Sequence, residues 1–536
     1  MNTLYYGDNL DILRNREYLP SESVDLVYLD PPFKSDQEYN VLFAEQNGSR
    51  SVSQIQAFKD TWHWDRAAAK IYEETVEGGG KVSDALRAFH ELVKPSDMLA
   101  YLAMMAPRLA ELHRVMKPTG SIYLHCDPAA SHYLKLLLDA IFGPANFRNE
   151  IIWERTTGRK GMRQYGRVHD VILFYAKSAE TAFNPPTMPH GNKVKGHDLV
   201  RDASGSMVRS SDLSAPGQGP PRRFGGQWIA PPVGTHWKYK QDGIDRLTAE
   251  GRIIFSGGGR PRLKNPVRDI AVRDIWTDIK PINSAAKERL RYPTQKPEAL
   301  LERIIQGSSN DGGVVLDPFC GCGTAVAVAQ RLNRRWIGID ITHLAIGLIR
   351  HRLISAFGHE IVETFEVVGE PTDPAGARAL SLANRFQVQC WALGRVGAQH
   401  GGKGADRGID GRLYFHDEPG AAKTKQIIFS VKSGAVEVKD ARDLCAVVGR
   451  EKADMGVLIT LEPATRPMRT EASGAGFYKS PWGTHPRIQI LTVAEILSGK
   501  GIDMPPLRQV DRTFKKAPRA KQTQAETIPL PLDAAE

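Results

Sequence analysis

The chain has 536 residues, 41% hydrophobic and 25% charged, which is the composition of a soluble globular protein with room for two or three cores. No run of about 18 apolar residues occurs, and the first residues lack a basic segment followed by an apolar one. We therefore expect neither a membrane span nor a secretory signal. The formal net charge is +10.

The charge is unevenly distributed along the chain. Residues 151–300 contain 26 Lys and Arg against 14 Asp and Glu, a net +12. A basic segment of this kind fits phosphate binding or a merely solvated surface equally well. The five cysteines are scattered, and the close pair Cys320 and Cys322 lacks neighbouring His partners, so no zinc site is expected. We expect a reducing cytoplasm as the compartment.

Strand-like and helix-like patterns alternate through residues 1–180, which predicts a mainly parallel α/β sheet with helices on both faces. Strands are expected there at 24–29, 121–125, 150–153 and 170–175, and helices at 98–116 and 131–142. Residues 117–120 are expected to close the first of these helices. Residues 181–270 are rich in Pro, Gly, Ser and Arg and have little periodicity, which indicates a loop-rich insert.

Regular patterns return in residues 271–365, with a helix expected at 297–306 and strands at 314–316 and 336–339. The Pro- and Gly-containing stretch 366–381 is predicted to be a linker. A second α/β pattern follows over 382–504, and the basic, aperiodic tail 505–536 is predicted to be disordered.

A glycine-rich turn follows the strand expected at 314–316. Its residues are Asp317, Phe319, Gly321, Gly323 and Thr324. Glycines let the backbone approach a ligand closely, and Asp340, which ends the next strand, has the spacing of a carboxylate that accepts hydrogen bonds from ribose hydroxyls. The third glycine of a dinucleotide-binding turn is missing, so the pattern favours an adenosyl cofactor.

A second acidic turn, Asp30-Pro31-Pro32-Phe33, follows the apolar run 24–29. The exocyclic amine of a nucleobase is a poor nucleophile, so its methylation needs acceptors that hold the N–H groups. Asp30 supplies a carboxylate, and the stiff Pro31-Pro32 pair aims a backbone carbonyl. Phe33 offers a flat face for an extruded base.

These two turns, in this order, resemble those of the β-group (permuted) S-adenosylmethionine-dependent DNA amino-methyltransferases, which include type III modification subunits. The resemblance covers nearly everything from Tyr5 to Leu353 and implies a Rossmann-like methyltransferase fold that binds S-adenosylmethionine. It places Thr294, Gln295 and Lys296 near the cofactor and the catalytic turn, and it places Asp8 at the cofactor adenine. Asp8 also fits an N-cap for the turn that follows it.

The same resemblance implies double-stranded DNA as the partner and leaves a homodimer open. Asp at the first position of the catalytic turn favours adenine-N6 over cytosine-N4 without excluding the latter. The insert lies where the family carries its target-recognition region. Its candidate phosphate or guanine contacts are Arg222, Arg223, Arg260, Arg262 and Lys264.

The C-terminal pattern resembles the PD-(D/E)xK core of Mrr-like restriction endonucleases. Asp410 fits the Mg²⁺-binding carboxylate and Lys432 the lysine, whereas Ser430 stands where an acidic or amide residue belongs. Gln387 replaces the Glu that many relatives carry on the preceding helix. Cleavage in a fused restriction–modification protein and DNA binding without cleavage both stay open.

Two other interpretations of the whole chain are weighed against DNA methylation. One is a DNA-binding protein without catalysis, and the intact Asp30–Phe33 turn argues against it. The other is methylation of RNA or of a protein, which related turns perform. The basic insert and the nuclease-like second pattern favour DNA.

Overall fold

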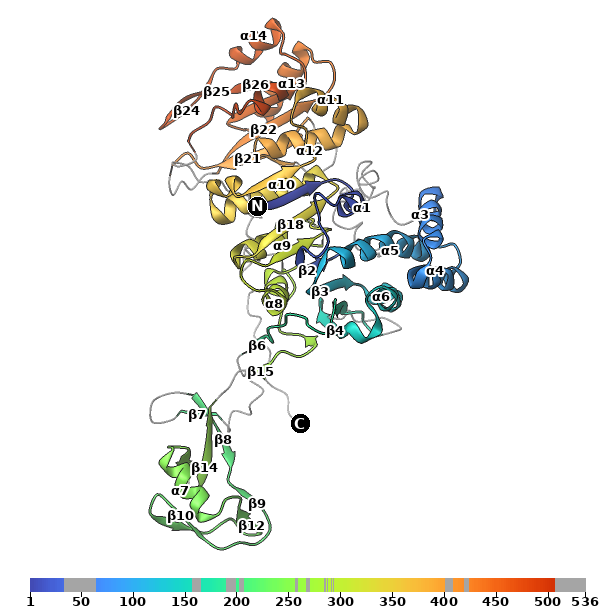
Figure 1. Cartoon of the computed structure of the whole chain (residues 1–536). Helices are drawn as coiled ribbons and strands as arrows, with labels where there is room; N and C mark the ends of the chain where they lie inside the picture. Colours follow the sequence, from blue (N-terminus) through green and yellow to red (C-terminus); the bar gives the residue numbers. More distant parts are fainter. Residues whose placement is uncertain are drawn as a thin grey trace, which may run out of the picture. The chain divides into compact units, whose positions relative to one another are not determined.

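The computed structural model describes residues 1–32, 64–156, 165–188, 199–201, 207–255, 259–266, 270–283, 286, 288–290, 292, 294–400, 408–418 and 424–506. The chain forms two compact units (Figure 1). The first joins Met1–Ala182 to Ile275–Glu536, and the second is Phe183–Asp274. Each unit is described by itself.

The described part of the first unit contains a nine-stranded sheet with the order β16-β4-β5-β3-β2-β17-β18-β1-β19. β5 is antiparallel to β3 and β4, and every other pairing is parallel. The central strands β2, β17, β18 and β1 therefore end at the same edge. The bounds are β1 Asn2–Tyr6, β2 Val24–Leu29, β3 Met116–Cys126, β4 Phe147–Glu154, β5 His169–Ala176, β16 Ile275–Trp276, β17 Val314–Asp317, β18 Arg335–Asp340 and β19 Phe365–Val368.

Helices cover this sheet, and several begin at side-chain caps that satisfy otherwise unpaired N–H groups. Asp8, Ser96, Asp127 and Thr342 cap α1, α5, α6 and α10 in this way. Apolar residues of β2, β3, α4, α5 and α6 form the main core. The helix bounds are α1 Asn9–Arg14, α3 Arg66–Glu77, α4 Gly80–Val93, α5 Asp97–Val115, α6 Pro128–Phe142, η1 Pro144–Asn146, α8 Glu298–Ser308, α9 Thr324–Arg331, α10 His343–Phe357 and η3 His359–Glu363.

The C-terminal part of the first unit contains a second sheet with the order β20-β21-β22-β23-β26, in which β22, β23 and β26 are parallel. Buried residues on its two sides form separate apolar clusters. The elements are α11 Pro374–Ala383, α12 Arg385–Arg395, β20 Gln399–His400, β21 Gly411–Phe415, β22 Lys425–Lys432, α13 Val438–Arg450, β23 Met455–Thr460, α14 Arg466–Gly474, β24 Phe477–Ser480, β25 Gly483–Pro486, β26 Ile488–Thr492 and α15 Val493–Leu497.

Helices α10 and α12 cross closely and link the two sheets. A Cβ built on Gly394 would lie 3.1 Å from the Cα of Gly347, so the crossing requires the absence of side chains there. The N–H of His343 donates to Oε1 of Gln387 at 2.9 Å, and the ring of Tyr6 stacks on the ring of His343 with centroids 3.7 Å apart. β1, the strand before Asp8, is thus in contact with the first turn of α10, and through α10 with α12.

The described part of the second unit contains a four-stranded antiparallel sheet of order β13-β14-β8-β7, the two-stranded antiparallel ribbons β10-β11, β12-β9 and β15-β6, and the helix α7. Its core consists of Leu213, Phe224, Trp237 and Ile244. The elements are β6 Thr187–Met188, β7 Leu199–Arg201, β8 Met207–Asp212, β9 Ser214–Pro216, β10 Arg222–Phe224, β11 Gln227–Ile229, β12 Thr235–Trp237, α7 Gln241–Ala249, β13 Ile253–Phe255, β14 Pro261–Pro266 and β15 Ile270–Ala271.

The predicted fold class is confirmed, and two local expectations are corrected. The stretch 366–381 is no structureless linker, because it completes β19 and forms most of α11. Asp373 caps α11 through the N–H of Gly376, and Pro374 takes the first helical turn, where proline is favourable. Residues 117–120 extend β3 rather than close α5.

The predicted tail lies almost entirely outside the described residues. None of the helices that the structure describes has the length and apolar character needed to cross a membrane.

Candidate functional site

Four acidic residues lie at the carboxyl edge of the central parallel strands. Asp30 follows β2, Asp317 ends β17, Asp340 ends β18, and Asp8 stands two residues after β1. Parallel pairing brings these positions to one edge, because neighbouring parallel strands end on the same side of a sheet. The structure therefore gathers the predicted residues of both acidic turns.

Asp30 forms an ion pair with the ammonium group of Lys296, through Oδ2. The side chains are only 15% and 9% exposed, so this charge pair is largely removed from water. Lys296 precedes α8, 266 residues away in the chain. Pro31 is buried beside Asp30, and Phe33 lies outside the described residues.

Asp317 and Asp340 lie in a poorly solvated environment. Burial, with the charges of Asp30 and Asp340, raises the pKa of Asp317 well above its ordinary value, against the opposing N–H of Phe319. Burial likewise raises the pKa of Asp340 to about 6, although Thr342 and Gly321 hydrogen-bond to it. Asp317 and Asp340 therefore hold protons more readily than isolated carboxylates would.

The glycine-rich turn is held onto Asp340. The N–H of Gly321 donates to Oδ2 of Asp340 at 2.9 Å, while the N–H and hydroxyl of Thr342 donate to Oδ1, each at 2.9 Å. The N–H of Ile341 is a further donor to the same carboxylate, so Asp340 is held by several groups of its own loop. Gly321 has φ +49°, and a Cβ there would lie 3.2 Å from the ring of Tyr292. The turn thus requires glycine.

The rest of this turn is structural. Gly323 has φ +71° at the start of α9, and a Cβ on it would lie 2.7 Å from Cγ1 of Ile349. The hydroxyl of Thr324 accepts from the guanidinium of Arg352 at 3.1 Å. Phe319 is partly exposed and its N–H donates to Asp317.

Asp8 is fixed by an arginine that sequence reasoning missed. Arg108, 4% exposed, donates to both carboxylate oxygens of Asp8 at 2.9 and 3.0 Å and to Oδ1 of Asn9 at 2.6 Å. The Nδ2 of Asn9 in turn donates to the carbonyl of Pro318 at 2.8 Å. Asp8 is also the N-cap of α1. An arginine within the otherwise apolar part of α5 was the available signal.

A second buried network begins at Tyr28, on the strand that ends before Asp30. The hydroxyl of Tyr28 is 3.1 Å from Nδ1 of His125, and Nε2 of His125 is 3.1 Å from Oδ2 of Asp170. Arg155 donates to the other oxygen of Asp170 at 2.9 Å. Burial raises the pKa of Asp170, but the contacts with His125 and Arg155 outweigh it and leave the pKa below its ordinary value. This network stiffens the strand end that carries Asp30.

The two residues before Lys296 do different work. The Oε1 of Gln295 accepts from the N–H of Leu290 at 2.8 Å, and its Nε2 donates to the carbonyl of Glu288 at 2.6 Å. Gln295 therefore shapes its own loop. Thr294 is exposed and has φ +63°, a conformation uncommon for a β-branched residue. Neither side chain contacts Asp30 in any described interaction.

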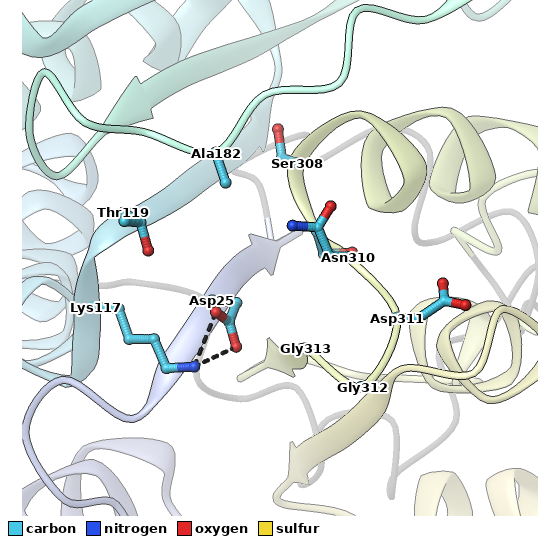
Figure 2. Close-up of a pocket in the computed structure, with 10 residues that line it drawn as sticks. Asp25, Lys117, Thr119, Ala182, Ser308, Asn310, Asp311, Gly312 and Gly313 are labelled. Atoms are coloured by element: carbon cyan, nitrogen blue, oxygen red, sulfur yellow. Dashed lines mark hydrogen bonds and ion pairs between the residues drawn. The ribbon is translucent and has the colours of Figure 1, made fainter.

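The pocket in Figure 2, of about 260 Å³, lies at the opposite, amino end of the same strands. Asp25 at the start of β2 accepts from Lys117 at 2.9 and 2.8 Å and from the N–H of Val314 at 2.8 Å. Its charge is already compensated by groups that hold the sheet together. This pocket is therefore distinct from the acidic edge.

The candidate contacts in the second unit divide into two sets. Arg260 donates to Asp212 at 2.9 Å and to Ser214 at 3.0 Å, and Arg262 donates to Ser210 at 2.8 Å, so both stabilise the unit itself. Lys264 lies on β14 with its side chain partly exposed. Arg222 and Arg223 lie on β10, and Arg223 is exposed.

The predicted nuclease-like residues meet on neighbouring strands. Asp410 precedes β21, and its Oδ2 accepts from the N–H of Val431 at 2.6 Å, between Ser430 and Lys432 on β22. Burial raises the pKa of Asp410, with Lys432, Ser430 and Gln389 opposing this shift. Lys432 lies 3.6 Å from Asp440.

The amide that approaches Asp410 is Gln389, which the sequence analysis missed. Gln387, its neighbour on α12, instead faces His343 of α10. Glu437 and Glu451 are the acidic residues that could replace the missing carboxylate. In the structure Glu437 caps α13, and Glu451 pairs with Arg412 at 2.9 Å. Within the described residues no group of three His, Cys, Asp or Glu side chains could hold a metal ion.

An acidic carboxyl edge with a glycine-rich turn on a mixed sheet is typical of α/β folds that bind nucleotide-like cofactors. Residues 24–349 match the N6/N4 DNA methylase family. The chain belongs to this DNA methylase family, as its motifs predict. Residues 386–479 match the Mrr catalytic family of restriction endonucleases, so the C-terminal domain is Mrr-like.

Individual relatives agree with this assignment. The type II methyltransferase M.EcaI of Enterobacter cloacae is 28% identical over 359 residues, which are 66% of this chain and 69% of that protein. The DNA adenine methyltransferase YhdJ of Escherichia coli K12 is 25% identical over 362 residues, 67% of this chain and 85% of its own. Among solved structures, the M1.HpyAVI–SAM complex has a TM-score of 0.32 at 16% identity and covers 66% of this chain and 99% of its own. Other curated relatives are matched over 50% to 60% of their length.

The ion pair between Asp30 and Lys296 gives a stability prediction. Lys296→Met is expected to lower the free energy of unfolding by about 3 kcal/mol, because it leaves a largely buried carboxylate without its partner. The double variant Asp30→Asn/Lys296→Met is expected to be more stable than Lys296→Met alone. Urea unfolding measures both.

Lys117→Met is the matched control, because Lys117 and Asp25 form a more exposed pair on the same sheet, with side chains 35% and 24% exposed. Its expected cost is about 1 kcal/mol or less. Equal losses of unfolding free energy in Lys296→Met and Lys117→Met would contradict the prediction that the more buried Asp30–Lys296 pair matters more for stability.

Proposed function

We propose that this chain transfers a methyl group from S-adenosylmethionine to the exocyclic amine of a flipped base in double-stranded DNA, and that the base is adenine, methylated at N6. The observation that carries the proposal is the convergence of Asp30, Asp317 and Asp340 at one strand edge. The first belongs to the acidic Pro-Pro turn, and the others flank the glycine-rich turn.

The residues of this edge fit an adenosyl cofactor. Gly321 and Gly323, both with positive φ, allow the tight turn that brings the backbone against Asp340, and the Asp340 carboxylate would accept a hydrogen bond from a ribose hydroxyl. Asp8, held by Arg108, would face the amine of the cofactor's adenine. When bound, the cofactor supplies an electrophilic methyl group on a sulfonium. Thr294, Gln295 and Lys296 belong to the same proposed site.

Asp30 would accept a hydrogen bond from the base amine and so draw its lone pair out of conjugation. Its Oδ2 is already engaged by Lys296, which leaves Oδ1 for the substrate. The paired ammonium group keeps a negative carboxylate compatible with the nearby Asp317. The Pro31-Pro32 segment fixes the carbonyl that would accept the second N–H, and Phe33 would stack on the base.

Adenine is favoured over cytosine by the aspartate at the start of the turn and by the adenine-methylating relative YhdJ. Cytosine-N4 methylation is the alternative, and base-resolved sequencing of methylated plasmid decides between the two. Parallel reactions with RNA and with protein acceptors test the remaining substrate classes.

Removing the proposed acceptor tests the catalytic assignment. Asp30→Ala is expected to reduce the methylation rate of duplex DNA at least about 100-fold, since it removes a preorganised electrostatic contact. Labelled S-adenosylmethionine measures the rate, and calorimetry measures cofactor affinity, which is expected to change much less. Retention of methylation by the variant would remove Asp30 from the mechanism.

Asp340 makes cofactor binding dependent on pH. With its pKa at about 6, the carboxyl group is mostly ionised at pH 7 and about one tenth ionised at pH 5. If the ionised form binds the ribose, the Kd for S-adenosylmethionine should be about tenfold weaker at pH 5 than at pH 7.5. Calorimetric titration across this range measures it.

The sign of this effect separates binding from stability. Because the folded-state pKa of Asp340 exceeds its ordinary value of 3.8, ionisation of Asp340 costs folding free energy as the pH rises from about 4 to 6. Loss of binding at acid pH therefore does not follow from destabilisation by this group. Asp340→Asn is expected to bind more weakly at neutral pH and to lose most of the pH dependence. An unchanged pH profile in that variant would assign the titration elsewhere.

We further propose that the Mrr-like domain engages DNA without cutting it, since Ser430 replaces the second acidic or amide residue. Wild-type protein is expected to leave unmethylated plasmid intact in Mg²⁺. Ser430→Glu adds a carboxylate next to the strand position of Asp410 and is expected to tighten Mn²⁺ binding, measured by calorimetry against Ser430→Gln. Cleavage by wild-type protein that Asp410→Ala abolishes would overturn this proposal.

A further inference from the structure

The second unit carries a short hairpin with a regular two-residue turn. β10 and β11 pair in the register Arg222↔Ile229, Arg223↔Trp228 and Phe224↔Gln227. The turn between them is Gly225-Gly226, with φ +54° and +94°. Positive φ at both central residues is the turn geometry that matches the twist of a hairpin. The ribbon therefore has a defined register and two distinct faces.

One face of this ribbon anchors it to the unit. The ring of Phe224 is 1% exposed and packs edge-on against Trp237, with centroids 4.9 Å apart. The indole N–H of Trp237 donates to the carbonyl of Ile229 at 3.0 Å. The ribbon is thus attached through both of its strands.

The side chain of Gln241, at the start of α7, fixes the backbone of β10 as well. Its Oε1 accepts from the N–H of Arg223 at 2.9 Å, and its Nε2 donates to the carbonyl of the same residue at 2.8 Å. These two bonds occupy the outer edge of the strand at the position of Arg223. That side chain is therefore presented from a preorganised backbone.

The other face presents Arg223 beside Trp228. Side chains alternate along strands, so these directly paired residues point away from Phe224 and Ile229. Trp228 is 71% exposed, and Arg223 is exposed. Tryptophan and arginine are both among the residue types enriched at binding hot spots.

The charge of the unit indicates what this face binds. Residues 183–274 contain 15 Lys and Arg against 8 Asp and Glu, a net +7 out of the chain's +10. A positively charged unit is complementary to a phosphate backbone. A two-stranded ribbon fits the major groove of duplex DNA, where arginine recognises guanine through two hydrogen bonds.

We propose that the Arg222–Ile229 hairpin is the element that reads duplex DNA, with Arg223 contacting a guanine edge and Trp228 packing on the neighbouring sugar or base. The inference rests on the proposed function for its substrate class. It assigns target recognition to two residues on one face of one ribbon. Arg260 and Arg262, which are engaged within the unit, have no such role.

The test compares Arg223→Ala and Trp228→Ala in the full chain. Each is expected to weaken binding to methylatable duplex about 10-fold in fluorescence anisotropy and to raise the KM for DNA, with little change in the Kd for S-adenosylmethionine. Arg223→Lys keeps the charge and loses the fork, so it is expected to lose sequence preference while retaining the salt dependence of binding.

Matched controls are available in the same unit. Arg246→Ala removes an exposed charge from α7, and Phe255→Ala removes an aromatic side chain that is 50% exposed. Both are expected to bind within about 2-fold of wild type, since surface changes away from an interface have small effects. Circular dichroism of each variant checks that the unit stays folded.

The outcomes separate the two levels of the argument. Wild-type protein that methylates DNA while Arg223→Ala and Trp228→Ala match it in KM and sequence preference would overturn the hairpin assignment alone. Wild-type protein that neither binds nor methylates DNA but methylates RNA or protein would overturn the proposed function and the hairpin assignment together. Equal losses of DNA binding in the control variants would show that Arg223 and Trp228 have no specific role, and would also overturn the hairpin assignment.

Discussion

Parallel pairing of β2, β17, β18 and β1 is the constraint on which the rest of the first unit depends. Their register brings the ends of strands from the beginning and the middle of the chain to one edge. Side chains hundreds of residues apart thereby become neighbours, as the contact of Lys296 with Asp30 shows. A shift of one strand would separate the acidic turn from the glycine-rich turn. The ordering of the sheet therefore comes before any chemistry at its edge.

Electrostatic compensation at that edge is the second requirement. Burial raises the pKa values of both Asp317 and Asp340, and at Asp317 the charges of Asp30 and Asp340 add to this effect. Lys296 and Arg108 offset the charge at Asp30 and Asp8, respectively. Both cations are nearly buried and lie outside the strands, Arg108 on α5 and Lys296 in the segment just before α8. The acidic edge thus depends on the helical layer for its charge balance as well as for its core.

Helices α10 and α12 connect the two sheets of the first unit close to the acidic edge. His343 follows Asp340 by three residues, stacks on Tyr6 and donates its N–H to Gln387 of the Mrr-like domain. Two glycines let the helices that carry these residues cross without side chains between them. The Mrr-like domain is therefore packed on helix α10 of the methylase part. The helix α11, in a stretch expected to be a linker, packs within the C-terminal domain.

The sequence by itself determined the class of fold, the two acidic turns, the resemblance to DNA methylases and the Asp410–Lys432 pattern, because each depends on local strand–turn chemistry. It could not determine which distant groups contact those turns. The family resemblance placed Lys296 near the Asp30 turn, but the ion pair between them, and the roles of Arg108 and Gln389, became apparent only in the tertiary structure, since long-range packing decides which buried polar groups meet. The same holds for α11, where a capping Asp and a first-turn Pro start a helix that composition suggested was a linker. Strand register likewise decides which arginines of the second unit bond within it and which are exposed on a ribbon. Composition alone does not determine strand register.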